Sequence, residues 1–137
     1  MATRELSAKM LNALAKNIPW LIGGSADLAP STKTRLTFEG AGDFSAENYA
    51  GRNFHFGIRE HAMGAVLNGM SLVKVRPFGS GFFIFVDYMR GAPRLSALIE
   101  LPVFAFLLTI PLASARTVQL TSQSKSLHIC ARCLDLS

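Results

Sequence analysis

A carboxylate between two basic neighbours is the group of this 137-residue chain best placed to do chemistry. The string GIREHAMG, at 57–64, sets Glu60 between Arg59 and His61, at the start of a segment with helical spacing of apolar residues. The unpaired N–H groups and the dipole of a helix N-terminus favour negative charge there. Glu60 is therefore a candidate proton handler, although most glutamates at helix starts only complement the charge of the helix.

A second candidate segment combines glycines with short polar side chains. The string GGSADLAPS, at 23–31, follows an apolar run and contains Ser25, Asp27 and Ser31. Glycines at a strand end allow close backbone approach and positive φ angles. The segment predicts a ligand-binding loop, and a plain polar turn with Asp27 as a cap remains the alternative.

A third segment spaces aromatic rings by three residues. Phe82, Phe85 and Tyr88 fall along one side of a predicted helix in the string FFIFVDY. Such a stripe ordinarily packs into a core. Beside a crevice it would instead form a stacking pocket for a flat heteroaromatic ring.

Strand and helix signals alternate along the chain, and the predicted strands are continuously apolar. We expect helices at 3–16, 60–72 and 82–98, strands at 20–22, 54–58, 73–78 and 102–108, and a long loop at 25–50. This pattern predicts an α/β fold, with a parallel sheet covered by helices on both faces. Ligands of such sheets bind at the carboxyl ends of the strands, where Asp27, Glu60 and Phe82 would share one crevice.

Composition excludes several classes of protein. Half of the residues are hydrophobic and 17% are charged, so we expect a buried core rather than disorder. The net charge is +5, but the basic residues are scattered, which predicts no nucleic-acid groove and suits a small phosphorylated molecule. The apolar run 101–115 contains two prolines and is too short to span a membrane. No signal peptide opens the chain, so we expect a cytoplasmic or organellar enzyme.

The motifs, taken in order, resemble the transketolase family. They are ATR at 2–4, GGSADLAPS, GIREHAMG followed by Asn68-Gly69, RPFGSGFFIFVDYMRGA at 76–92, and RLSAL at 94–98. Their order and spacing are similar to those of the pyrimidine-binding (Pyr) domain, over about 1–106. The string NYAGR at 48–52 is most like the plant, fungal and bacterial branch of the family.

The resemblance implies an enzyme that uses thiamine diphosphate and a divalent metal, Mg²⁺ or Ca²⁺. Such enzymes transfer a two-carbon ketol unit from a ketose phosphate to an aldose phosphate in the pentose phosphate pathway. Glu60 matches the catalytic glutamate, which hydrogen-bonds N1′ of the aminopyrimidine and favours the imino tautomer. Phe85 matches the ring that stacks on the aminopyrimidine, and Phe82 and Tyr88 line the same pocket.

The resemblance also implies residues for the substrate and for assembly. Asp27 matches a carboxylate at the cofactor and at the dimer interface. Arg4 and Ser31 match residues that hold the phosphate of a sugar-phosphate substrate, a role that suits the arginine fork. The implied partner is a second transketolase subunit or a separate diphosphate-domain chain. No nucleic acid and no membrane are expected, and the implied location is cytoplasmic or plastid.

The resemblance stops near the end of the chain. We expect 1–107 to be a fragment of the Pyr domain and 108–137 to be an aberrant tail outside the native fold. The tail begins LTIPLASARTVQLTSQSK, where the family has THDSIGLGEDGPTHQPIE, and one choice of codons encodes both strings in frames shifted by one base. The string HICARC, with Cys130, Cys133 and His128, is then not expected to bind a metal.

The amino-terminal domain that binds diphosphate and metal in the family is expected to lie outside this chain. We therefore expect the chain alone to be inactive. The alternative is a non-catalytic dimerisation or binding fragment. Two departures from the family lie in or beside the motifs. Gly81 replaces a common Thr. Pro93 interrupts the predicted helix, at a cost of up to about 3 kcal/mol if that helix stays straight.

Overall fold

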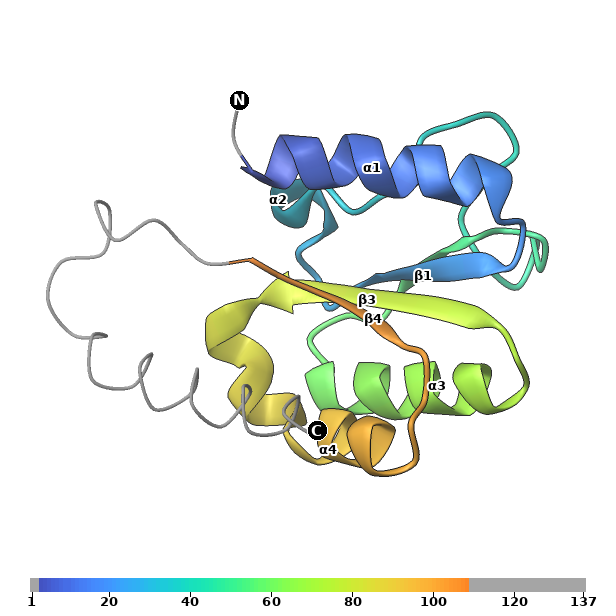
Figure 1. Cartoon of the computed structure of the whole chain (residues 1–137). Helices are drawn as coiled ribbons and strands as arrows, with labels where there is room; N and C mark the ends of the chain where they lie inside the picture. Colours follow the sequence, from blue (N-terminus) through green and yellow to red (C-terminus); the bar gives the residue numbers. More distant parts are fainter. Residues whose placement is uncertain (1–2, 109–137) are drawn as a thin grey trace, which may run out of the picture.

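The computed structural model describes residues 3–108, which form a parallel α/β sheet with helices on both faces. The strands lie in the order β2-β1-β3-β4, and every neighbouring pair is parallel. Figure 1 shows α1 and α2 on one face and α3 and α4 on the other. The predicted fold class is confirmed.

The elements are α1 (Thr3–Asn17), β1 (Leu21–Ser25), α2 (Ala29–Thr32), β2 (Asn53–His55), α3 (Glu60–Leu72), β3 (Arg76–Phe82), the 3₁₀ helix η1 (Phe83–Met89), α4 (Gly91–Leu98) and β4 (Phe104–Leu108).

Each face of the sheet has its own apolar core. On the α1 face, Leu11 and Ala15 pack with Leu21, Leu36 and Phe78. On the α3 face, Met63 and Leu67 pack with Ala26 and Met89. Phe78 of β3 is fully buried in the core on the α1 face, and Gly79, the next residue, lies against Leu67 and Met63 of the other core.

Two strands are longer than predicted, because their glycines continue the strand instead of ending it. β3 runs through Gly79 and Gly81 to Phe82. A Cβ at Gly79 would lie 2.4 Å from Cδ1 of Leu67, so glycine is what allows α3 to pack this close to the sheet. β1 likewise includes Gly23 and Gly24.

The helix predicted at 82–98, with a kink expected at Gly91 and Pro93, is two separate helices in the structure. Phe82 is the last residue of β3, η1 follows it, and α4 begins afresh at Gly91. Pro93 thus lies in the first turn of α4, where its missing N–H removes no helical hydrogen bond. The expected cost of a proline inside a straight helix therefore does not arise.

The predicted loop at 25–50 contains the short helix α2 and is tied down by side chains near its end. Asn53 accepts a hydrogen bond from the Leu36 N–H (2.8 Å) and donates to the Leu36 and Gly42 carbonyls (both 3.0 Å). Arg52 donates to carbonyls of Ala15, Ile18 and Leu21. Burial lowers the pKa of Arg52 from its ordinary value.

Within residues 3–108 no helix is long and apolar enough to cross a membrane. The tail predicted at 108–137, with Cys130, Cys133 and His128, lies outside the described residues except for Leu108, which ends β4.

Candidate functional site

A cavity of about 730 Å³ opens where the carboxyl ends of β1 and β3 meet the start of α3. Figure 1 shows η1 and the start of α3 at the same end of the sheet as the arrowhead of β3. The sheet topology therefore gathers residues that are far apart in the sequence. The cavity is lined by Ala26, Asp27, Leu28, Ile58, Arg59, Glu60, His61, Ala62, Phe85 and Tyr88.

Glu60 is the first residue of α3 and is half-buried. It follows a sharp turn in which Gly57 has a φ of 64° and Arg59 donates to the Phe56 carbonyl (3.1 Å). Among the described residues the carboxylate of Glu60 has no hydrogen-bond or ion-pair partner. The first-turn N–H groups of α3 complement its charge, and its oxygens remain available to a ligand in the cavity.

Asp27 also lines the cavity, and its backbone conformation is uncommon. Its φ is 60°, in the left-handed region, directly after β1 ends at Ser25. Such a conformation costs about 1–3 kcal/mol and persists only where the surroundings impose it. Here the Ala26 N–H donates to the Ser80 carbonyl (3.2 Å) and the Ser25 hydroxyl donates to the same carbonyl (3.1 Å).

A buried cluster of hydroxyl groups holds this loop against β3. The hydroxyl of Thr34 lies 2.8 Å from that of Thr32 and 2.5 Å from that of Ser80. All three residues are at most 2% exposed. The cluster links the segment after Asp27 to β3, the strand that leads into the aromatic segment. These hydrogen bonds therefore connect the Asp27 wall of the cavity to the strand that carries its aromatic wall.

The aromatic wall is built on η1. A 3₁₀ helix repeats every three residues, so side chains three apart lie directly above one another. The rings of Phe85 and Tyr88 accordingly stack, with centroids 6.2 Å apart and an interplanar angle of 24°. Val86 and Met89 anchor η1 by pointing into the core. Tyr88 is 68% exposed, so much of the ring surface is open to a ligand.

Four of the seven site residues proposed from the sequence thus share one cavity: Asp27, Glu60, Phe85 and Tyr88. Phe82 ends β3 and is not among the described residues that line it. Arg4, in the first turn of α1, and Ser31, in α2, are both exposed and also lie outside that lining. The roles of all seven residues stay predictions.

Sequence reasoning missed Leu28, Ile58 and Arg59 as wall residues of the cavity. Leu28 and Ile58 carried no chemical signal, because isolated apolar residues in loops are common. Arg59 was noted only as a neighbour of Glu60. The position of Arg59 just before the predicted helix could have identified it as a wall residue. In α/β folds such a position lies at the edge of the sheet where ligands bind.

The chemistry of the cavity suits a flat, nitrogen-containing aromatic ring. Phe85 and Tyr88 offer a stacking surface, Ala26, Leu28 and Ile58 offer apolar walls, and Glu60 offers a carboxylate. Within residues 3–108 no group of three or more His, Cys, Asp or Glu side chains could hold a metal ion.

A family model and individual relatives both match this chain to transketolases. The model of the family described as "Transketolase, pyrimidine binding domain" matches residues 1–131. The transketolase of Bacillus subtilis is 58% identical over 104 residues, which are 75% of this chain and 15% of that protein. The chloroplastic transketolase of Zea mays is 54% identical over 101 residues, or 72% of this chain and 15% of that protein.

Solved structures give the same result. The transketolase of Leishmania mexicana superposes with a TM-score of 0.73 at 45% identity, covering 76% of this chain and 16% of its own. That of Campylobacter jejuni gives a TM-score of 0.70 at 45% identity, covering 77% and 16%. The chain spans about 15% of the length of the curated relatives that it matches.

Proposed function

This chain belongs to the transketolase family, through the pyrimidine-binding domain, and we propose that it forms the aminopyrimidine-binding half of a thiamine diphosphate site for ketol transfer. The observation that supports this proposal is the cavity that Glu60 and Asp27 line together with the stacked rings of Phe85 and Tyr88. The conversion is the transfer of a two-carbon ketol unit from a ketose phosphate to an aldose phosphate.

Thiamine diphosphate, when bound, supplies the nucleophilic carbon for ketol transfer. The residues of this chain bind and orient its pyrimidine end. Glu60 would hold a proton at ring nitrogen N1′, which suits a carboxylate without an internal partner among the described residues. Phe85 and Tyr88 would offer a stacking surface to the ring. Phe82, at the end of β3, would belong to the same pocket, and Asp27 would lie at the cofactor and at the dimer interface.

The substrates and the assembly are part of the same proposal. Arg4 and Ser31 hold the phosphate of the sugar substrate, Arg4 from the first turn of α1 and Ser31 from α2. The diphosphate and its Mg²⁺ or Ca²⁺ ion are bound by a diphosphate domain, carried by a second subunit or by a separate chain. The protein works in the cytoplasm or in a plastid, where relatives such as the Zea mays enzyme are named chloroplastic.

The domain boundary is also proposed. Residues 1–107 form the transketolase part, and 108–137 are an aberrant tail that a frameshift produces. The match of 104 residues with the Bacillus subtilis enzyme, which leaves about a quarter of the chain outside it, supports this boundary, whereas the family model extends its match to residue 131. The 137-residue chain by itself is then inactive in ketol transfer.

A chimera tests the function. The segment of Bacillus subtilis transketolase that matches this chain is replaced by the corresponding 104 residues. We expect the chimera to convert xylulose 5-phosphate and ribose 5-phosphate, with dependence on thiamine diphosphate, whereas the 137-residue chain alone shows no turnover. A folded, dimeric chimera without activity would contradict the proposal. Turnover by the isolated chain would contradict the assignment of half a site.

A further inference from the structure

The turn that precedes α3 is closed by Arg59. The N–H of Arg59 donates to the Gly57 carbonyl (2.8 Å), and the Arg59 carbonyl accepts from the Met63 N–H (2.8 Å). Nη1 of the guanidinium reaches back and donates to the Phe56 carbonyl (3.1 Å). Arg59 is therefore bonded both to the turn before it and to the helix after it, and the next residue along the chain is Glu60.

The Phe56 carbonyl is a well-held acceptor for this side chain. The Phe56 ring packs against the core cluster that contains Met63 and Leu67. It also stacks on Phe54 of β2, with ring centroids 6.0 Å apart and an interplanar angle of 17°. The bond from the guanidinium of Arg59 thus connects the start of α3 to the core on which α3 packs.

Gly57 provides the space that the guanidinium occupies. A Cβ on Gly57 would lie 3.1 Å from Nη1 and 3.7 Å from Cζ of Arg59, so the guanidinium lies directly against this residue. The φ of 64° at Gly57 is in the left-handed region, which glycine adopts without strain. The two residues therefore act as one unit, because Gly57 makes the turn and Arg59 holds it closed.

The same bond directs the charge of Arg59 away from the neighbouring carboxylate. An arginine beside a glutamate can form a strong, charge-assisted ion pair. Within residues 3–108 no ion pair joins Arg59 to Glu60, although both residues line the cavity. Such a pair would occupy the carboxylate oxygens that a ring nitrogen of a ligand needs.

We propose that Arg59 is the positioning residue of Glu60: its bond to the Phe56 carbonyl sets the direction of the first residue of α3 and leaves the carboxylate open to the cavity. A residue that served only the helix would be Ser, Thr, Asp or Asn, whose side chains accept from first-turn N–H groups. Arg59 stands at the N-cap and makes no such bond. The effect on catalysis rests on the proposed function, whereas the closed turn does not.

The variant R59N tests the proposal, because it exchanges the guanidinium for a favourable N-cap. In the chimera, kcat should fall at least about tenfold with thiamine diphosphate binding retained, since misplacing a reacting group by about 1 Å can cost 100-fold. The urea midpoint of the 137-residue chain should be unchanged or higher, because asparagine caps the helix. R59K should restore most of kcat, because an ammonium can also make the single bond to the Phe56 carbonyl.

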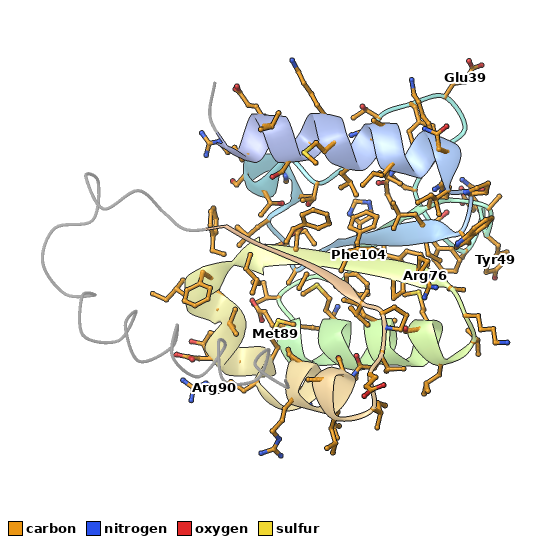
Figure 2. The ribbon with its side chains drawn as sticks, in the orientation of Figure 1. Glu39, Tyr49, Arg76, Met89, Arg90 and Phe104 are labelled. Carbon is orange, nitrogen blue, oxygen red and sulfur yellow. The ribbon has the colours of Figure 1, made fainter. Side chains whose placement is uncertain are left out.

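Hydrogen exchange in the 137-residue chain measures the turn by itself, through the amide of residue 59, which donates to the Gly57 carbonyl. R59N should lower the protection of this amide. The matched control R76Q, at the opposite end of the sheet from η1 as Figure 2 shows, should change neither protection nor kcat. The proposal is overturned by full kcat in R59N, by a urea midpoint that falls together with kcat, by no recovery in R59K, or by unchanged protection in R59N. An inactive unmodified chimera would contradict the proposed function, and the exchange experiment would still decide whether Arg59 holds the turn.

Discussion

At the residue scale, the free carboxylate of Glu60 is the feature on which the proposed chemistry depends. In the chimera, Glu60→Gln keeps the size of the side chain and removes its proton-accepting ability. We expect kcat to fall at least about 100-fold, with thiamine diphosphate binding retained, because general acid–base groups contribute factors of this size. Steady-state kinetics and cofactor titration measure the two effects.

The control for Glu60 is Glu47→Gln, which changes an exposed loop glutamate remote from the cavity lining. It should leave kcat unchanged. Full activity of the Glu60→Gln chimera would remove Glu60 from the mechanism, and equal losses in both variants would show a general effect of charge.

Residues that stand in a short, recognisable motif could be predicted from the sequence. Residues that become neighbours only when the helices pack on the sheet could not. Glu60 and Asp27 were predictable because each stands in a short string with a helix-start or strand-end signal. Lys9 and Lys33 were recognised only as members of a scattered set, since their proximity depends on how α1 and α2 pack over the sheet.

At the element scale, two glycines of α3 have opposite roles. A Cβ at Gly69 meets nothing within 4 Å, whereas a Cβ at Gly64 would lie 2.6 Å from the Cβ of Ala92 in α4. Gly69→Ala should therefore stabilise the chain by up to about 1 kcal/mol through helix propensity. Gly64→Ala should destabilise it by about 1–3 kcal/mol, because α4 must move away.

Urea unfolding of both glycine variants, followed by circular dichroism, measures these free energies. The two changes add the same methyl group to the same helix, so each controls for the other. Stabilisation by Gly64→Ala would mean that α3 and α4 do not pack as described.

Arg52 connects α1 to the sheet. Its guanidinium donates to the carbonyls of Ala15, Ile18 and Leu21, at the carboxyl end of α1 and the start of β1. A single lysine ammonium cannot reproduce this planar fork. We expect Arg52→Lys to lower the free energy of unfolding by about 1–3 kcal/mol, because buried carbonyls lose their donors.

The exposed Arg94→Lys is the matched control for Arg52 and should change stability little. Denaturant midpoints measure both variants. An unchanged midpoint for Arg52→Lys would show that water replaces the guanidinium at these carbonyls.

The ends of an element could be predicted where the repeat of apolar residues defines them. They could not be predicted where a glycine can either end a strand or continue it. α3 was predicted at its observed bounds, because a helix needs only its own repeat. β3 was ended too early at Gly79, since a sequence does not show whether a glycine breaks a strand or admits a neighbouring side chain, here Leu67. The aromatic segment was predicted as one longer helix because, over only seven residues, a spacing of three fits both the 3.0-residue turn of η1 and the 3.6-residue turn of an α-helix.

At the scale of the whole molecule, the described residues form a four-stranded sheet in which β4 is the last strand along the chain. Phe106 of β4 packs edge-on against Phe78, with ring centroids 6.2 Å apart. β4 pairs with β3 from Phe104 to Leu108. If the proposed boundary is correct, the sheet needs β4 and does not need the residues that follow it.

Two truncations separate these contributions. Ending the chain after Leu108 should change the free energy of unfolding by less than about 1 kcal/mol, since no selected contact is lost. Ending it after Val103 removes the strand that covers β3 and the partner ring of Phe78, so it should cost several kcal/mol, as the loss of buried aromatic surface does elsewhere. Urea unfolding of the full chain and of the two truncated chains, followed by the fluorescence of Trp20, gives the three free energies of unfolding to compare. A loss of more than about 1 kcal/mol on removal of 109–137 would place the tail inside the fold and contradict the frameshift, because a string never selected for this sheet has no reason to stabilise it.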